Sequence, residues 1–309
     1  MSSIAVKASA GTERRIKRRA RRKESLPERR AINPDERDEA RRGAVELAAR
    51  IVWPAAVGIA FVALWQVGFL HALLGLERFQ LPVPSEIVQA LAAHLPKYLY
   101  DCGVTVSGAF IGMILGSAIG FGVALLATAF PSWGYGGLVL VSAFNSIPIV
   151  ALSPIMNRWF SVGMAQKIGV VTIVTMAAMA INAYRGLNDL QPFSLDLLRS
   201  YVATKREVFV KLRLPNCLPS VFTALKINIT SAMIAAIVSE YFASSTAGLG
   251  FGIKDNLRKA EMAMGWAYIV VASVAGIALY LCILFAERRS TSWHASQSAA
   301  AGERIGGKA

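Results

Sequence analysis

Long apolar runs dominate this sequence and constrain its fold more than any other feature. Crossing about 30 Å of hydrocarbon takes roughly 20 helical residues. Five runs reach or approach that length: Ile51–Leu70, Val104–Ala127, Ile168–Leu187, Ser220–Phe242 and Trp266–Phe285. A sixth, Leu138–Met156, is interrupted by Pro148 and Pro154. Because backbone groups in lipid must be satisfied within each segment and the runs are continuous rather than alternating, the sequence predicts an all-α, polytopic membrane protein with about six transmembrane helices.

Charge is concentrated at the amino-terminal end, where residues 1–50 hold 15 of the 33 Lys and Arg of the chain. Residues 1–43 lack apolar periodicity, so we expect a disordered, basic cytoplasmic tail there. We expect a membrane domain over 44–289 and a second disordered cytoplasmic tail over 290–309. RNA or DNA binding by Arg14–Arg22 is the alternative, but a basic run before the first span favours contact with anionic membrane lipid, so we expect no nucleic-acid partner.

The basic residues also set the expected orientation. With the amino terminus inside, an even number of spans returns the carboxyl terminus to the cytoplasm, where Arg288 and Arg289 follow the last run. The loop between the fourth and fifth spans is then cytoplasmic and holds Arg199, Lys205, Arg206, Lys211 and Arg213. The outer segments hold Arg78, Lys97, Arg158, Lys167, Lys254, Arg258 and Lys259, so the inside excess is clear only when the tail is counted.

That cytoplasmic loop, Ser194–Pro215, reads SLDLLRSYVATKREVFVKLRLP. Its first half predicts a short helix with Leu195, Leu198 and Val202 on one apolar face and with Leu197 and Tyr201 on the edge of that face. Asp196 and Arg199 face away in this arrangement. The apolar face of this helix packs against the bundle, against a partner protein or against the lipid headgroups, and the sequence leaves these three alternatives open.

The second half of the loop predicts another short helix. Thr204 and Glu207 have the spacing of a capping box, in which each side chain satisfies a backbone N–H of the other residue. Val208, Phe209 and Leu212 then form an apolar face. We expect Leu214-Pro215 to end this helix and Pro219 to open the next span.

The loop resembles the coupling loop, the EAA motif, of membrane permeases from bacterial ABC importers. Leu212-Arg213-Leu214-Pro215 fits the close of that motif, and counting back places Asp196-Leu197-Leu198 at its Glu-Ala-Ala start and Val202 at its glycine. Further matches, in the order of the family, are Leu81-Pro82-x-Pro84-Ser85, Ile147–Pro154 with Trp159-Phe160, and Ser239-Glu240 followed by Gly248-Leu249-Gly250. The resemblance covers roughly residues 50–287 and is closest to the nitrate/sulfonate/taurine branch, which includes permeases for pyrimidine and vitamin precursors.

The resemblance implies a MetI-like permease architecture in a bacterial inner membrane and a path for a small solute. It implies cytoplasmic ATPase subunits, a second permease copy, expected as a homodimer, and a periplasmic or lipid-anchored solute-binding protein as partners. The residues implied in ATPase coupling are Leu195, Asp196, Leu198, Arg199, Tyr201, Val202, Ala203, Thr204, Glu207, Phe209, Leu212 and Pro215. Val202 departs from the family glycine, and a β-branched residue is strained there if φ is positive. Leu197 and Leu198 are bulkier than the family alanines.

No residues suited to catalysis stand out in the sequence. The three cysteines, Cys102, Cys217 and Cys282, are scattered, and no CxxC spacing or His cluster predicts a metal site. The chain has no GxxxxGK[ST] loop for nucleotide phosphate. We therefore expect a non-catalytic transport subunit with no cofactor of its own and with ATP hydrolysis on a partner chain.

Polar groups within the apolar runs are costly in lipid and are the candidates for the translocation path. They are Asn145, Ser146 and Pro148 in the broken span, together with Asn182, Asn228 and Glu240. For Asn182 and Asn228 the alternative is an interhelical hydrogen bond, and for Glu240 it is a hydrogen bond to the Gly248 turn. Lys226 is expected to snorkel to the cytoplasmic edge.

Two further features bear on packing and on the choice of function. Gly108, Gly112, Gly116 and Gly120 predict a smooth helix stripe for close packing within the bundle or against another subunit. The alternative to an ATP-driven importer is a secondary transporter driven by an ion gradient. It is disfavoured because Glu240 is the one acid within the spans and no internal repeat is visible. The solute itself is not readable from these residues.

Overall fold

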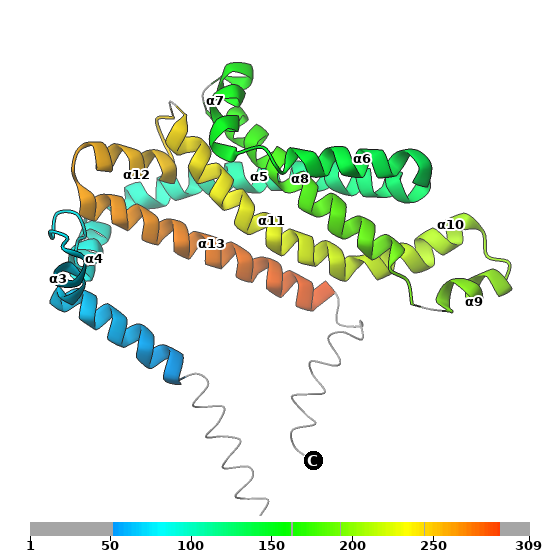
Figure 1. Ribbon diagram of the computed structural model, residues 1–309, viewed down its shortest axis with the longest axis horizontal. Coiled ribbons are helices and arrows are strands. Elements are labelled where there is room, and N and C mark those ends of the chain that lie inside the picture. The colour runs from blue at the N-terminus through cyan, green and yellow to red at the C-terminus, as the bar shows by residue number, and fades with distance from the viewer. Residues whose placement is uncertain (1–51, 162, 192, 244, 291–309) are drawn as a thin grey trace, which may run out of the picture. The chain divides into compact units, whose positions relative to one another are not determined.

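The computed structural model describes residues 52–161, 163–191, 193–243 and 245–290, and every regular element in these ranges is helical (Figure 1). This confirms the predicted all-α class. The predicted tail 1–43, and 290–309 apart from Ser290, lie outside the described residues. The chain divides into two units at Ala60, and apart from the helix that begins at Val52 the features below lie in the second unit, from Phe61 onward.

The helices follow one another with short connections. After a helix over Val52–Val67 come α3 (Phe69–Leu74), α4 (Pro84–Ala93), α5 (Leu95–Ala129), α6 (Pro131–Phe144), α7 (Ile149–Phe160) and α8 (Met164–Asn188). The loop then holds α9 (Ser194–Ser200), α10 (Lys205–Val208) and the π-helical segment η1 (Phe209–Arg213). The chain continues through α11 (Leu214–Phe242), α12 (Leu249–Arg258) and α13 (Met262–Ser290).

Among the described residues, four helices are long and apolar enough to cross a membrane, namely Leu95–Ala129, Met164–Asn188, Lys205–Phe242 and Met262–Ser290. The predicted broken span is the pair Gly134–Phe144 and Ile149–Phe160, bent by 99°. Pro148 at the bend adopts an extended conformation and has no N–H to continue the helix. The described helix in the first predicted run, Val52–Val67, is shorter than a span and ends where Gly68 adopts φ 89°. The described residues thus contain four or five spans, and six are not confirmed.

The glycine stripe of α5 packs against α8. A Cβ added to Gly112 or Gly116 would run into Val171 or Thr175, and one added to Gly120 would meet the backbone of Met176. The Thr172 hydroxyl donates across the same interface to the carbonyl of Gly112 at 3.3 Å. The stripe therefore serves close helix packing inside the bundle, as small residues do in membrane proteins.

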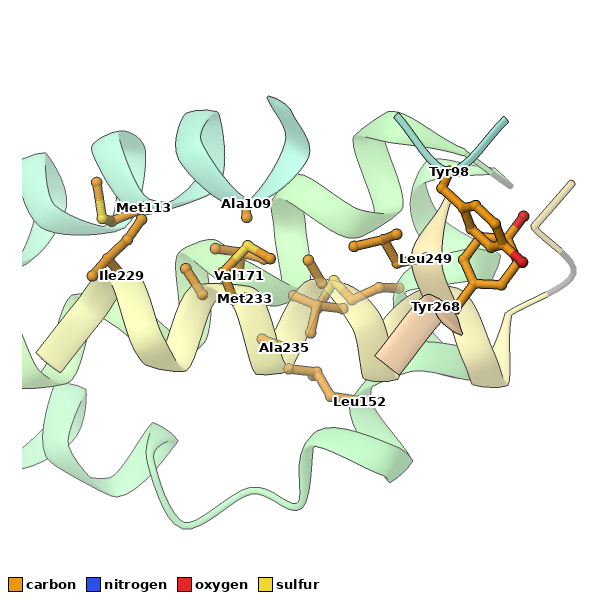
Figure 2. Packing of buried hydrophobic residues seen from close by; sticks show 14 of the residues in the cluster. Tyr98, Ala109, Met113, Leu152, Val171, Ile229, Met233, Ala235, Leu249 and Tyr268 are labelled. Atoms are coloured by element: carbon orange, nitrogen blue, oxygen red, sulfur yellow. The ribbon is translucent and has the colours of Figure 1, made fainter. Parts of the chain in front are cut away.

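The main apolar core joins α5, α7, α8, α11, α12 and α13 (Figure 2). Figure 2 shows Met113, Val171, Ile229 and Met233 packed between helices that are far apart in the sequence. At one end of this core the rings of Tyr98 and Tyr268 meet edge to face, with centroids 4.5 Å apart. This core holds α12 against the long helices and so fixes the polar groups described next.

Candidate functional site

The first candidate region is the loop between α8 and α11. Its short helix α9 ends in a pair of backbone hydrogen bonds, from Val202 N–H to the Arg199 carbonyl at 2.9 Å and from Ala203 N–H to the Leu198 carbonyl at 3.1 Å. This is the Schellman arrangement, which places one residue in the left-handed region and normally uses glycine there. Val202 occupies that place with φ 55°. The condition under which a valine is strained at the family glycine position, a positive φ, is therefore met.

The exposed apolar face of α9 differs from the predicted one. Leu195 and Leu198 are half-buried, whereas Leu197, Tyr201 and Phe193 are 59%, 76% and 82% exposed. Val202 lies beyond the end of the helix and is 87% exposed, so it does not share a face with Leu195 and Leu198. The helix is shorter than predicted because the Schellman turn ends it at Ser200.

The second loop helix begins as predicted and ends differently. Glu207 N–H donates to the Thr204 hydroxyl oxygen at 3.3 Å, and Thr204 N–H donates to the Glu207 carboxylate at 2.9 Å, which confirms the capping box. The prediction that Leu214-Pro215 ends this helix is wrong, because one helix runs from Lys205 to Phe242. The π segment accounts for this: Leu214 N–H bonds to the Phe209 carbonyl, and this wider turn lets a proline without an N–H follow inside the helix.

The carboxyl-terminal arm of the loop is tied to the end of α8. Arg213 donates to the Leu187 carbonyl at 3.1 Å and to the Asn188 side-chain oxygen at 2.7 Å. Asn216 donates to the carbonyls of Gly186 and Asp189 at 3.0 and 2.9 Å. Among the other predicted coupling residues, Phe209 packs against the bundle, Leu212 is half-buried and Pro215 is exposed. These contacts hold the arm in place and leave α9 as the more exposed part of the loop.

The predicted path residues do not converge on one place. Asn145, Ser146 and Pro148 are exposed at the break between α6 and α7. Asn182 donates to the Ala178 carbonyl of its own helix at 2.8 Å. Asn228 is fully buried and donates to the Ser117 hydroxyl of α5 at 3.0 Å.

Snorkelling of Lys226 to the cytoplasmic edge stays a prediction. The ammonium of Lys226 forms an ion pair with Glu287 of α13 at 2.8 Å and is mostly buried. A cation in this setting links α11 to α13, because the carboxylate satisfies it within the protein.

Glu240 belongs to a second candidate region, a buried polar cluster. Its side chain is 1% exposed and forms an ion pair with Lys167 of α8. The carboxylate also accepts hydrogen bonds from the Thr105 hydroxyl at 2.9 Å and from Gly250 N–H at 2.8 Å. The predicted hydrogen bond to the Gly248 turn is thus made two residues further on. Lys167, predicted to lie in an outer segment, is instead buried inside the bundle.

Asp101 forms the other half of the polar cluster. It accepts hydrogen bonds from Gly248 N–H at 2.9 Å and from the Tyr268 hydroxyl at 2.7 Å. At the start of α12, Gly248 N–H and Gly250 N–H thus donate to the two carboxylates, and Leu249 N–H donates to the Thr105 hydroxyl oxygen at 2.8 Å. An α-helix N-terminus favours such negative charge. The cluster therefore clamps α12 to α5, α8, α11 and α13.

Sequence reasoning missed Asp101, Thr105, Lys167 and Tyr268 as members of this cluster. Thr105 precedes the glycine stripe on α5 by one turn, and Lys167 lies near the start of an apolar helix. An acid within a membrane span, such as Glu240, normally pairs with a nearby cation, and this rule could have indicated Lys167 as its partner. Within the described ranges, no group of three or more His, Cys, Asp or Glu is suited to a metal ion.

Comparison with known proteins places these features in context. The family model described as "binding-protein-dependent transport system inner membrane component" matches residues 112–291. A probable ABC transporter permease protein of Haemophilus influenzae is 27% identical over 76% of this chain and 94% of its own length. The formylaminopyrimidine transport permease protein ThiX of Halalkalibacterium halodurans is 27% identical over 76% and 93%. The taurine transport system permease protein TauC of Escherichia coli is 25% identical over 73% and 78%.

Solved structures support the same fold. A crystal structure of an amino acid ABC transporter with histidines matches 65% of this chain and 97% of that chain, with a TM-score of 0.54 and 16% identity. The MetNI methionine ABC transporter in an inward-facing conformation matches 64% and 98%, with a TM-score of 0.53 and 18% identity. At these identities the likeness concerns the helical architecture alone.

Proposed function

The chain belongs to the family of binding-protein-dependent transport system inner membrane components, a family of ABC importer permeases, and on that premise we propose its individual role. It forms the translocation path for a small solute and couples that path to a separate ATPase through residues 194–215. The proposed setting is a bacterial inner membrane with both termini in the cytoplasm. The proposed partners are cytoplasmic ATPase subunits, a second copy of this permease and a periplasmic or lipid-anchored solute-binding protein.

One observation carries the coupling role: α9 presents large apolar side chains to solvent. Phe193, Leu197 and Tyr201 are all more than half exposed, and they lie on a loop whose other arm is anchored to α8. Aromatic and aliphatic side chains that stand free on an ordered element are typical anchors of protein interfaces. An ATPase docked on this face would move α9 and, through the turn at Val202, the helix that starts at Lys205.

The solute is proposed only as a class. The relatives include permeases named for taurine, nitrate and formylaminopyrimidine transport. We therefore propose a small polar solute, either of the nitrate, sulfonate or taurine kind or of the pyrimidine or vitamin-precursor kind. The alternative of an ion-driven transporter finds less support, because the Glu240 carboxylate is engaged by Lys167, Thr105 and Gly250.

The test is copurification of candidate ATPase subunits with the permease. We expect Leu197→Asp with Tyr201→Asp to reduce the bound ATPase at least tenfold, because it places two charges in an apolar contact. Val88→Asp is the matched control, since Val88 is a similarly exposed apolar residue on α4. Size-exclusion profiles of both variants should match the parent. Undiminished ATPase binding by the loop variant, with an intact profile, would refute the coupling role.

A further inference from the structure

A basic hollow of about 690 Å³ lies on the other side of the same loop, away from the exposed face of α9. Its cations are Arg199, Lys205, Arg206 and Arg213. The half-buried Leu195 and Phe209 line the hollow together with the junction of α5 and α6, at Ala129 and Pro131. The predicted apolar run of the second span ends at Ala127. The hollow therefore begins at the level where the hydrocarbon-spanning part of α5 ends.

The basic hollow has little negative charge around it in the part of the chain that the structure describes. Among the described residues, no carboxylate lies within 4.0 Å of Lys205, Arg206 or Arg213. Arg213 bonds to neutral oxygens of Leu187 and Asn188. Arg199 is 3.8 Å from Asp196, but both side chains are largely exposed and water screens their attraction. An anionic group would find several unneutralised donors here, as phosphates do at Arg and Lys clusters.

An apolar hollow of about 320 Å³ adjoins the basic one. It lies between α5 and α6 and is lined by Val123, Leu126, Phe130, Gly134 and Gly137. Phe130 lies between Ala129 and Pro131 in the chain, and both of those residues line the basic hollow. The junction of α5 and α6 thus borders a cationic site on one side and an apolar groove along two membrane helices on the other.

We propose that an anionic phospholipid binds at this junction, with its headgroup phosphate at Lys205 and Arg206 and an acyl chain in the hollow between α5 and α6. Basic sites between membrane helices at the cytoplasmic boundary suit such headgroups. A free phosphate would use only the basic hollow, whereas a lipid uses both. The inference rests on the proposed function in one point, the assignment of the opposite face of α9 to the ATPase. A bound lipid would link α10 to the α5–α6 junction and so support the position of the loop.

The test is lipid binding to the delipidated full chain in detergent, followed by native mass spectrometry. Phosphatidylglycerol and phosphatidylcholine with identical acyl chains are the two probes. We expect phosphatidylglycerol to bind at least tenfold more tightly, and we expect Lys205→Gln with Arg206→Gln to remove about tenfold of that affinity. Lys211→Gln is the matched control, because Lys211 is on the same loop, is paired with Glu207 and does not line the hollow.

A second variant tests the acyl-chain part of the site. A side chain at Gly137 would project into the apolar hollow, and its Cβ would meet only Val123, at 3.9 Å. Gly137→Leu should therefore fold and should weaken phosphatidylglycerol binding severalfold. Soluble glycerol 3-phosphate should not compete at concentrations near that of the lipid.

Three results would overturn the proposal. Equal phosphatidylglycerol binding by all variants would mean a non-specific lipid annulus. Tight binding of glycerol 3-phosphate, unaffected by Gly137→Leu, would mean a free-phosphate site. Loss of ATPase from the Lys205→Gln and Arg206→Gln variant in phosphatidylcholine nanodiscs would assign the hollow to the ATPase contact. Failure of the coupling role is seen separately, in the Leu197→Asp and Tyr201→Asp variant.

Discussion

The buried polar cluster around Glu240 and the loop around Leu197 differ in burial, in backbone conformation and in how their charges are paired. The polar cluster around Glu240 is buried, and its ion pair to Lys167 and its hydrogen bonds to Thr105 and Gly250 lie within the protein. The loop around Leu197 exposes apolar side chains, holds Val202 at a positive φ and contains Lys205 and Arg206, which have no carboxylate of the described residues within 4.0 Å. The cluster thus satisfies its polar groups internally, whereas the loop leaves both its apolar and its charged groups to be satisfied by something else.

The difference between the cluster and the loop shows which polar residues of a membrane protein are better assigned to function. Glu240 and Lys167 are the most conspicuous charges inside the bundle, yet their geometry is that of a helix clamp. In the loop, by contrast, Leu197 and Tyr201 are largely exposed, and among the described residues no carboxylate lies within 4.0 Å of Lys205 or Arg206. An unusual residue type therefore points to structure as readily as to function, and the missing partner is the more useful sign.

The largest effect should come from breaking the cluster. Lys167→Met leaves the buried carboxylate of Glu240 without its cation, and removing one partner of a buried pair costs about 3–5 kcal/mol of unfolding free energy. We expect a clear fall in the thermal midpoint of the detergent-solubilised protein, followed by intrinsic tryptophan fluorescence. Lys259→Met is the control, because its ion pair with Asp255 is exposed and should leave the midpoint unchanged. Similar midpoints for the two variants would contradict the clamp.

A smaller effect is expected from the glycine stripe, which tests whether close packing extends along α5. Gly116→Ala places a methyl group against Thr175 and the Thr172 backbone and should destabilise the protein by about 1–3 kcal/mol. Gly122→Ala in the same helix meets no atom within 4 Å and should be neutral or stabilising by up to about 1 kcal/mol. The same thermal measurement applies, and a shared sign for the two variants would contradict this packing.

The smallest effect should come from the loop, where relieving strain changes local order alone. Val202→Gly removes roughly 1–2 kcal/mol of left-handed strain, which the greater freedom of glycine in the open loop partly offsets. We expect amide exchange over 194–204 to slow by up to about fivefold, with an unchanged thermal midpoint. Val210→Gly, at an exposed helical position, should instead accelerate local exchange. Faster amide exchange in Val202→Gly would contradict this prediction and would show that the valine side chain stabilises the turn.

Local sequence signals predicted much of this fold. The spans follow from apolar length, the bend at Pro148 from its missing N–H, and the Thr204–Glu207 cap from a three-residue spacing. Each of these depends on residues close together in the chain. The counted position of a family glycine also marked Val202 as strained if its φ is positive, and the structure has φ 55° there.

Features that depend on distant residues were not predicted. Lys167 and Glu240 are 73 positions apart, and only the packing of α8 against α11 brings them together, so Lys167 was placed in an outer segment. Whether the apolar face with Leu195 and Leu198 packs on the bundle or on a partner was left open, because helical periodicity does not tell which side the bundle occupies. The continuation of the helix through Pro215 depends on a π turn, and the sequence contains no local pattern that predicted this turn.

That π turn has a mechanical consequence. Because it joins α10 to α11 without a break, Lys205–Phe242 is one rod of 38 residues, about 57 Å long at 1.5 Å per residue. The cap at Thr204 lies just before one end, and Glu240 lies at the other, where the cluster grips it. If this helix rotates as a rigid body about Glu240, a tilt of about 5° moves the Lys205 end by about 5 Å. A displacement of the loop then shifts every side chain along α11, by an amount that grows with its distance from Glu240.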